Sequence, residues 1–133
     1  MGASIGMAKG AAEAGFYPVL ATLGDSTFFH SGVTPLIDAV SANADMTVVI
    51  MDNSAVAMTG GQETILKTGS IENLVAGLGV PREHIRILTP LPKNFEENAA
   101  AIKEEIAYHG LSVIITRREC LETLKRKKKG EKE

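Results

Sequence analysis

Apolar runs and amphipathic segments alternate along the chain. Two runs, Val19 to Leu23 and Met46 to Met51, are rich in Val, Ile and Leu and are bounded by turn residues, which is typical of buried strands. Shorter runs at 84–88 and 112–116 predict two more strands. Helices are expected at residues 2–15, 33–43, 71–78 and 95–108. This alternation predicts an α/β domain with three layers, α/β/α, around a mainly parallel sheet.

The first two strands bring two polar segments, 24–32 and 52–62, to one edge of that sheet. A right-handed crossover makes the strands parallel, so their carboxyl ends share the edge where open α/β sheets usually bind ligands. Adjacent strands lie roughly 4.8 Å apart, which lets Asp25 and Asn53 meet. A carboxylate, an amide oxygen and a backbone carbonyl just after Asn53 suit Mg²⁺ that also binds a phosphate. From the residues alone, an ordinary pair of loop residues is the alternative, with Asp25 as a turn former and Asn53 as a cap.

A longer pattern at this edge resembles a known family. GDS at 24–26, followed by DN at 52–53, resembles the motif of thiamine diphosphate enzymes. The wider segments GDSTFFHSG and TVVIMDNSAVAMTGGQ are similar to the 2-oxoacid:ferredoxin oxidoreductases, and most to the large (alpha) subunits of indolepyruvate ferredoxin oxidoreductases. The resemblance runs from Gly2 to about Cys120. It implies the thiamine diphosphate-binding fold, and within it the C-terminal domain that holds the diphosphate.

The resemblance also implies which residues bind the cofactor and its metal ion. The Mg²⁺ ligands would be Asp25, the Asn53 side chain and the Ala55 carbonyl. The diphosphate would lie against Gly24, Ser26 and the Thr59-Gly60 turn. Gly61 departs from the pattern, because the family carries a larger residue there, often His. This departure bears on the identity of the substrate more than on the identity of the cofactor.

The first helix carries Gly2, Gly6 and Gly10 at four-residue spacing. Glycine costs about 1 kcal/mol per helix-interior position, so this spacing suggests a close approach to the helix backbone. Tight packing on the sheet would explain the glycines equally well. By resemblance, the ASIG sequence at 3–6 is similar to the turn that meets the aminopyrimidine ring. The Ala3 carbonyl and the Ile5 N–H would then bond the ring, and the Ile5 side chain would prop the cofactor in its bent conformation.

His30 lies in a segment, Thr27 to Gly32, that we expect to be a loop on the ligand edge. A histidine there could be a general acid or base near neutral pH. It could equally be a polar plug bonded to a backbone carbonyl. Thr34-Pro35 predicts the start of the next helix, since proline is tolerated in a first turn.

The second half of the chain predicts ordinary helix and strand positions. We expect residues 63–70 to form a loop, His84 to be a solvated residue at a strand start, and Asn94 to cap the helix 95–108. An apolar stripe from Phe95 to Ile106 faces the core in this prediction. The opposite, solvated face is expected to carry Glu96, Glu97, Lys103, Glu104 and Glu105.

Composition narrows the class of protein. The 133 residues, 44% hydrophobic and 23% charged, suit one globular domain, expected at 1–124. No apolar run approaches the ~20 residues that span a membrane. A single cysteine, Cys120, excludes an internal disulfide and any iron–sulfur cluster held by this chain alone. We predict a cytoplasmic protein whose basic tail, 125–133, is a linker or frayed helix end rather than a nucleic-acid or membrane contact.

By resemblance, the function is oxidative decarboxylation of a 2-oxoacid, an aryl pyruvate such as indolepyruvate, to an acyl-CoA with reduction of ferredoxin. The cofactors would be thiamine diphosphate and Mg²⁺, with 4Fe-4S clusters only in a partner domain. The expected partners are a pyrimidine-binding domain or subunit, a second oxidoreductase subunit, ferredoxin and coenzyme A, in a homo- or hetero-oligomer. Since the chain starts one helix before its first strand, we expect a fragment or a split subunit that is inactive alone.

Two alternatives stay open at this point. One is a split subunit of a thiamine-dependent decarboxylase that resembles sulfopyruvate decarboxylase and transfers no electrons. The other is a non-catalytic α/β binding module, which would show no Mg²⁺-dependent affinity for thiamine diphosphate.

Overall fold

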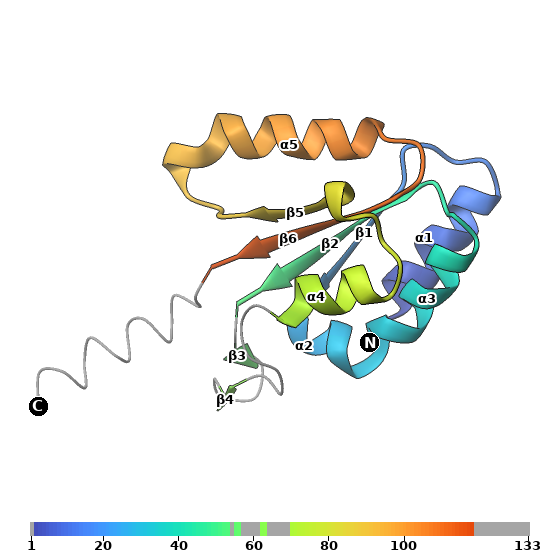
Figure 1. Ribbon diagram of the computed structural model, residues 1–133, viewed down its shortest axis with the longest axis horizontal. Helices are drawn as coiled ribbons and strands as arrows, with labels where there is room; N and C mark the ends of the chain where they lie inside the picture. The colour runs from blue at the N-terminus through green and yellow to red at the C-terminus, as the bar shows by residue number, and fades with distance from the viewer. Residues whose placement is uncertain (1, 54, 57–61, 64–69, 119–133) are drawn as a thin grey trace, which may run out of the picture.

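The computed structural model describes residues 2–53, 55–56, 62–63 and 70–118. Their centre is a parallel sheet with the strand order β1-β2-β6-β5 (Figure 1). The strands are β1 (Leu20–Gly24), β2 (Met46–Asp52), β5 (Ile85–Leu88) and β6 (Leu111–Arg117). All four predicted strands are therefore present, and the prediction of a parallel sheet is confirmed.

Helices cover both faces of this sheet. They are α1 (Ala3–Glu13), α3 (Val33–Ser41), α4 (Ser70–Gly77) and α5 (Phe95–Ala107). Side chains of α1, α3 and α4 form one apolar cluster with alternate residues of the strands, such as Val48 and Val113, which are completely buried. Helix α5 lies on the opposite face (Figure 1). The three-layer α/β/α prediction is confirmed.

The α5 layer covers the sheet unevenly. Helix α5 packs on β6 and reaches β2, and the Thr47 hydroxyl donates to the Glu105 carbonyl at 3.2 Å. Toward β1, on the same face, Leu20 is 42% exposed and Met51 is 48% exposed. Among the described residues, no helix is both long enough and apolar enough to cross a membrane.

The loop expected at Thr27 to Gly32 is helical instead. A short helix α2 (Asp25–Thr27) continues through a π-helical turn, η1 (Phe28–Gly32), directly into α3. Helix α3 itself begins at Val33, so Pro35 lies in its first turn as predicted, but the residues before it are helical as well. The wide π turn just before Pro35 is where a missing N–H is tolerated, because the regular hydrogen-bond ladder is already interrupted there. Phe28, completely buried, fixes this turn in the core.

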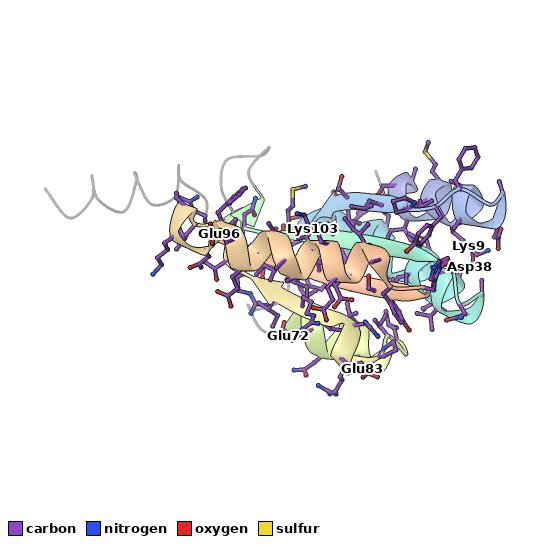
Figure 2. All side chains as sticks on the ribbon, turned by 90° about the horizontal axis from the view of Figure 1, so that it is seen from above. Lys9, Asp38, Glu72, Glu83, Glu96 and Lys103 are labelled. Atoms are coloured by element: carbon purple, nitrogen blue, oxygen red, sulfur yellow. The ribbon has the colours of Figure 1, made fainter. Side chains whose placement is uncertain are left out.

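Two expectations about solvated residues were also wrong. Glu105 is only 1% exposed, and its carboxylate accepts hydrogen bonds from Arg86 Nε at 2.6 Å and pairs with His84 Nδ1 at 3.0 Å. His84 also stacks on Tyr108, with ring centroids 3.5 Å apart. The buried carboxylate is retained because it is fully paired. Figure 2 shows Glu96 and Lys103 on the outer side of α5, as predicted.

The remaining differences are local. The Asn94 side chain donates to the Thr89 carbonyl at 3.2 Å and makes no capping bond to α5. A 3₁₀ turn, η4 (Pro92–Asn94), precedes that helix, and Phe95 is 72% exposed instead of facing the core. Glu63, expected in a loop, lies in the short strand β4 (Gln62–Glu63). Ser70, also expected in that loop, begins α4, whereas residues 64–69, Cys120 and the tail 125–133 lie outside the described residues.

Candidate functional site

The carboxyl edge of the sheet brings the predicted metal ligands onto neighbouring strands. Gly24 pairs with Met51 at the end of the ladder. The next residues are Asp25, directly after β1, and Asp52, the last residue of β2. Asn53 comes directly after β2 and is half-buried. The two strands point the same way (Figure 1), which puts Asp25 and Asn53 at the same edge.

Asp25 is held in place by the start of a helix. It is the first residue of α2, is 3% exposed, and its Oδ1 accepts the Ser26 N–H at 2.8 Å. A carboxylate at a helix N-terminus interacts favourably with the unpaired N–H groups there. The local sequence therefore fixes the orientation of this carboxylate.

Two buried hydroxyls indicate that a polar ligand fits this edge. The Oγ atoms of Ser4 and Ser26 are buried without a hydrogen-bond partner among the described residues. Buried hydroxyls are normally hydrogen-bonded, and leaving one unpaired costs about 1–3 kcal/mol. Ser26 is adjacent to Asp25, so its hydroxyl is a donor that a phosphate oxygen could satisfy.

The first turn of α1 packs against the helical segment after Asp25. Gly2 has a φ of 79°, and a Cβ there would overlap the Ser31 side chain, so this position requires glycine. Ala3 is exposed, whereas Ile5 is completely buried in the core. His30 is exposed on η1. Ala3 and Ile5 lie on α1 and His30 on η1, and these two elements are in contact.

The chain after Asn53 turns back on itself. Strand β3 (Ala55–Val56) pairs in antiparallel fashion with β4. Ala55, the third candidate Mg²⁺ ligand, is part of this ladder. Thr59, Gly60 and Gly61 lie outside the described residues.

The sequence predictions missed an ion-pair cluster at this edge. Arg117, the last residue of β6, donates from Nε to Asp52 Oδ2 at 2.8 Å and from Nη2 to Glu72 Oε2 at 2.8 Å. Asp52 is 4% exposed. The hydrogen bond from Arg117 lowers the pKa of Glu72, and the bond to Glu72 together with the bond to Asp52 raises the pKa of Arg117. In the sequence, Asp52 follows the apolar run 46–51 and Arg117 follows the run 112–116. Nothing local indicates that these two residues pair, because the pairing depends on β2 lying next to β6.

Chemically, the edge offers few charged ligands. Within the described ranges, no group of three or more His, Cys, Asp or Glu side chains could hold a metal ion. A cation at Asp25 would therefore be bound by one carboxylate together with amide, main-chain and ligand oxygens, which is how Mg²⁺ is commonly held.

An apolar hollow lies elsewhere. It has a volume of about 430 Å³ and is lined by Leu88, Phe95 and Ile102 among others, between β5 and α5. Asp25 follows β1, at the opposite side of the sheet. The hollow is apolar and holds none of the candidate site residues, so the geometry at the strand ends is the better guide to the chemistry.

The chain is similar to known proteins over most of its length. Residues 1–125 match the family described as thiamine pyrophosphate enzyme, C-terminal TPP binding domain. The indolepyruvate oxidoreductase subunit IorA of Archaeoglobus fulgidus is 36% identical over 130 residues, which is 90% of this chain and 20% of that protein. Its counterpart in Methanothermobacter marburgensis is 34% identical over 131 residues, which is 91% of this chain and 21% of that protein.

Solved structures share the fold at low identity. The thiamine diphosphate-dependent 4-hydroxybenzoylformate decarboxylase of Rhodococcus jostii RHA1 superposes with a TM-score of 0.67 at 20% identity, over 90% of this chain and 23% of that one. Benzoylformate decarboxylase from Polynucleobacter necessarius gives 0.60 at 20% identity, over 88% and 23%. The chain spans about a fifth of the length of the curated relatives it matches.

Proposed function

The chain belongs to the thiamine pyrophosphate enzymes as a C-terminal TPP-binding domain, and on that premise we propose that it is the diphosphate-side part of a 2-oxoacid:ferredoxin oxidoreductase. The substrate would be an aryl pyruvate such as indolepyruvate, decarboxylated oxidatively to an acyl-CoA while ferredoxin is reduced. The observation that carries this proposal is the buried Asp25 at the same sheet edge as Asn53. The relatives named indolepyruvate oxidoreductase support the substrate class.

In this proposal Asp25, the Asn53 amide and the Ala55 carbonyl bind Mg²⁺. Thiamine diphosphate, when bound, supplies an electron sink for the carbanion left by loss of CO₂. The chain's own residues orient it. The diphosphate contacts would be Gly24, the Ser26 hydroxyl and the Thr59-Gly60 turn. The aminopyrimidine contacts would be the Ala3 carbonyl and the Ile5 N–H.

The reaction requires groups that this chain does not carry. Oxidative decarboxylation leaves two electrons, and one cysteine in 133 residues cannot hold an iron–sulfur cluster. We therefore propose 4Fe-4S clusters in a partner domain, a pyrimidine-binding domain or subunit, and a second oxidoreductase subunit. The length of the relatives, about five times the matched region, leaves room for such domains.

The metal site is tested by removing its carboxylate. In the assembled protein, Asp25→Ala is expected to reduce Mg²⁺-dependent affinity for thiamine diphosphate at least about 100-fold, because it removes the single charged protein ligand. Asn53→Ala should weaken binding about tenfold or more, since one neutral ligand is lost. Isothermal titration calorimetry measures both affinities.

A matched control is Asp38→Ala. Asp38 is 64% exposed on α3 and pairs with Lys9 at 3.1 Å, where Figure 2 shows both side chains. Its loss should leave cofactor affinity unchanged. Wild-type affinity in Asp25→Ala would disprove the site. Release of CO₂ without ferredoxin reduction by the complete assembly would point to a decarboxylase instead.

A further inference from the structure

One guanidinium joins three elements at the ligand edge. Arg117 ends β6 and is 25% exposed, while its partners Asp52 and Glu72 have side chains that are 3% and 24% exposed. Asp52 ends β2, and Glu72 lies in the first turn of α4. Both contacts are 2.8 Å long and charge-assisted, which makes them stronger and more directional than neutral hydrogen bonds.

The two carboxylates bracket the part of the chain that carries two of the three candidate Mg²⁺ ligands, Asn53 and Ala55. Asp52 immediately precedes Asn53, and Glu72 follows Ser70, where α4 begins. The Arg118 N–H also donates to the Asp52 carbonyl at 3.0 Å. The end of β6 therefore holds both the side chain and the backbone of Asp52, and the same arginine holds the start of α4.

We propose that Arg117 is a positioning residue for the metal and cofactor site. It fixes the β2 terminus so that Asn53 is presented toward Asp25, and it fixes the start of α4 at the other end of the intervening segment. It also neutralises Asp52, so that Asp25 remains the charged protein ligand and the diphosphate supplies the remaining negative charge. This inference rests on the proposed function.

The geometry explains why arginine is needed. Nε and Nη2 reach two different carboxylates from one planar group. Lysine carries the same charge but has a single flexible ammonium that does not reproduce this fork. Arg117→Lys should keep the neutralisation and lose part of the positioning, whereas Arg117→Met should lose both.

The chain offers a matched control in Arg86. It bridges two carboxylates as well, Glu105 at 2.6 Å and Glu104 at 2.9 Å. It lies on β5, the edge strand farthest from β1, and pairs with residues of α5 rather than with residues at the ligand edge. Arg86→Met therefore removes an equivalent ion-pair bridge without touching the candidate site.

The experiment measures cofactor binding and stability separately. Thiamine diphosphate is titrated calorimetrically into the assembled protein at several Mg²⁺ concentrations, and urea unfolding is followed for the full chain without cofactor. We expect binding by Arg117→Met to be about 10- to 100-fold weaker, as is usual when a residue supporting a metal ligand is lost. Arg117→Lys should fall between this variant and wild type. Arg86→Met should bind within about twofold of wild type, whatever its loss of stability.

Glu72→Gln gives a second variant in case Arg117→Met does not fold. It keeps the size of the side chain and removes the charge of one of the two carboxylates that pair with Arg117. The pair between Arg117 and Asp52 should remain, and we expect thiamine diphosphate to bind several-fold more weakly. Wild-type affinity in Glu72→Gln and Arg117→Lys would overturn the inference, as would equal losses of affinity in the Arg117 and Arg86 variants. Failure of the proposed function is distinct, because wild type would then not bind the cofactor or Asp25→Ala would bind it normally.

Discussion

His30 is exposed on the η1 turn, which is in contact with α1. If it transfers a proton during turnover, replacing it with a side chain that cannot titrate should act on rate and not on cofactor binding. We predict that His30→Asn lowers kcat in the assembled enzyme about 10²- to 10⁴-fold. The pH–rate profile should become flatter, because one titrating group has been removed.

The measurement is steady-state turnover between pH 6 and 9, with calorimetric cofactor affinity as the control. Unchanged turnover across this range would assign His30 a structural role only. A loss of rate that tracks a loss of cofactor affinity would contradict acid–base catalysis as well.

Glu105 shows where reasoning from the sequence fails at the scale of one residue. Its place in the helical pattern predicts a solvated position, since it follows Lys103 and Glu104. The structure buries it because Arg86 and His84 reach it from another part of the chain. Long-range charge pairs have no local signature, and the same limit hid the pair of Asp52 with Arg117. The common sheet edge of Asp25 and Asn53 could be predicted, because each follows a recognisable apolar run that forms a strand.

At the scale of elements, the π turn depends on the close packing of Gly32. A Cβ there would lie 2.8 Å from Phe28 Cδ2 and 3.0 Å from Leu23 Cδ1, and both side chains are buried. Alanine favours a helix by up to about 1 kcal/mol over glycine, but overpacking of a core costs about 1–3 kcal/mol. We predict that Gly32→Ala lowers the free energy of unfolding by about 1–2 kcal/mol.

Gly77→Ala is the matched control for this prediction. Gly77 also lies in a helix, α4, and a Cβ there would meet nothing within 4 Å. It should raise the free energy of unfolding by a few tenths to about 1 kcal/mol, through helix propensity alone. Urea denaturation of the two variants compares them directly, and a stabilising Gly32→Ala would show that the turn can relax.

The strands were predictable because buried parallel strands are continuous apolar runs, and all four lie within one or two residues of their predicted positions. The helical state of residues 25–32 was not, because serine and glycine within this segment are turn formers by local rules. Burial of Phe28, which is completely inaccessible, favours the helical turn there. Tertiary packing here overrides local propensity.

At the scale of the whole molecule, the proposed function assigns to this chain the contacts on the diphosphate side of the cofactor. We predict that the purified 133-residue chain releases no CO₂ from 2-oxoacids and reduces no viologen, with or without thiamine diphosphate and Mg²⁺. Adding the pyrimidine-binding partner should restore decarboxylation, and electron transfer should also require the iron–sulfur domain. Coupled assays follow both products, and appreciable turnover by the chain alone would refute the half-site interpretation.

The strand order β1-β2-β6-β5 has a further consequence for how the chain is made. β6 is the last of the described strands along the chain and a central strand of the sheet, so during synthesis β5 leaves the ribosome before the only described strand it pairs with. Pairing of β6 with β2 and β5 therefore closes long loops. The loss of chain entropy on closing these loops precedes the favourable strand pairing. Because Arg117 ends that same strand, its ion pair with Asp52 at the ligand edge forms in the same step that completes the sheet.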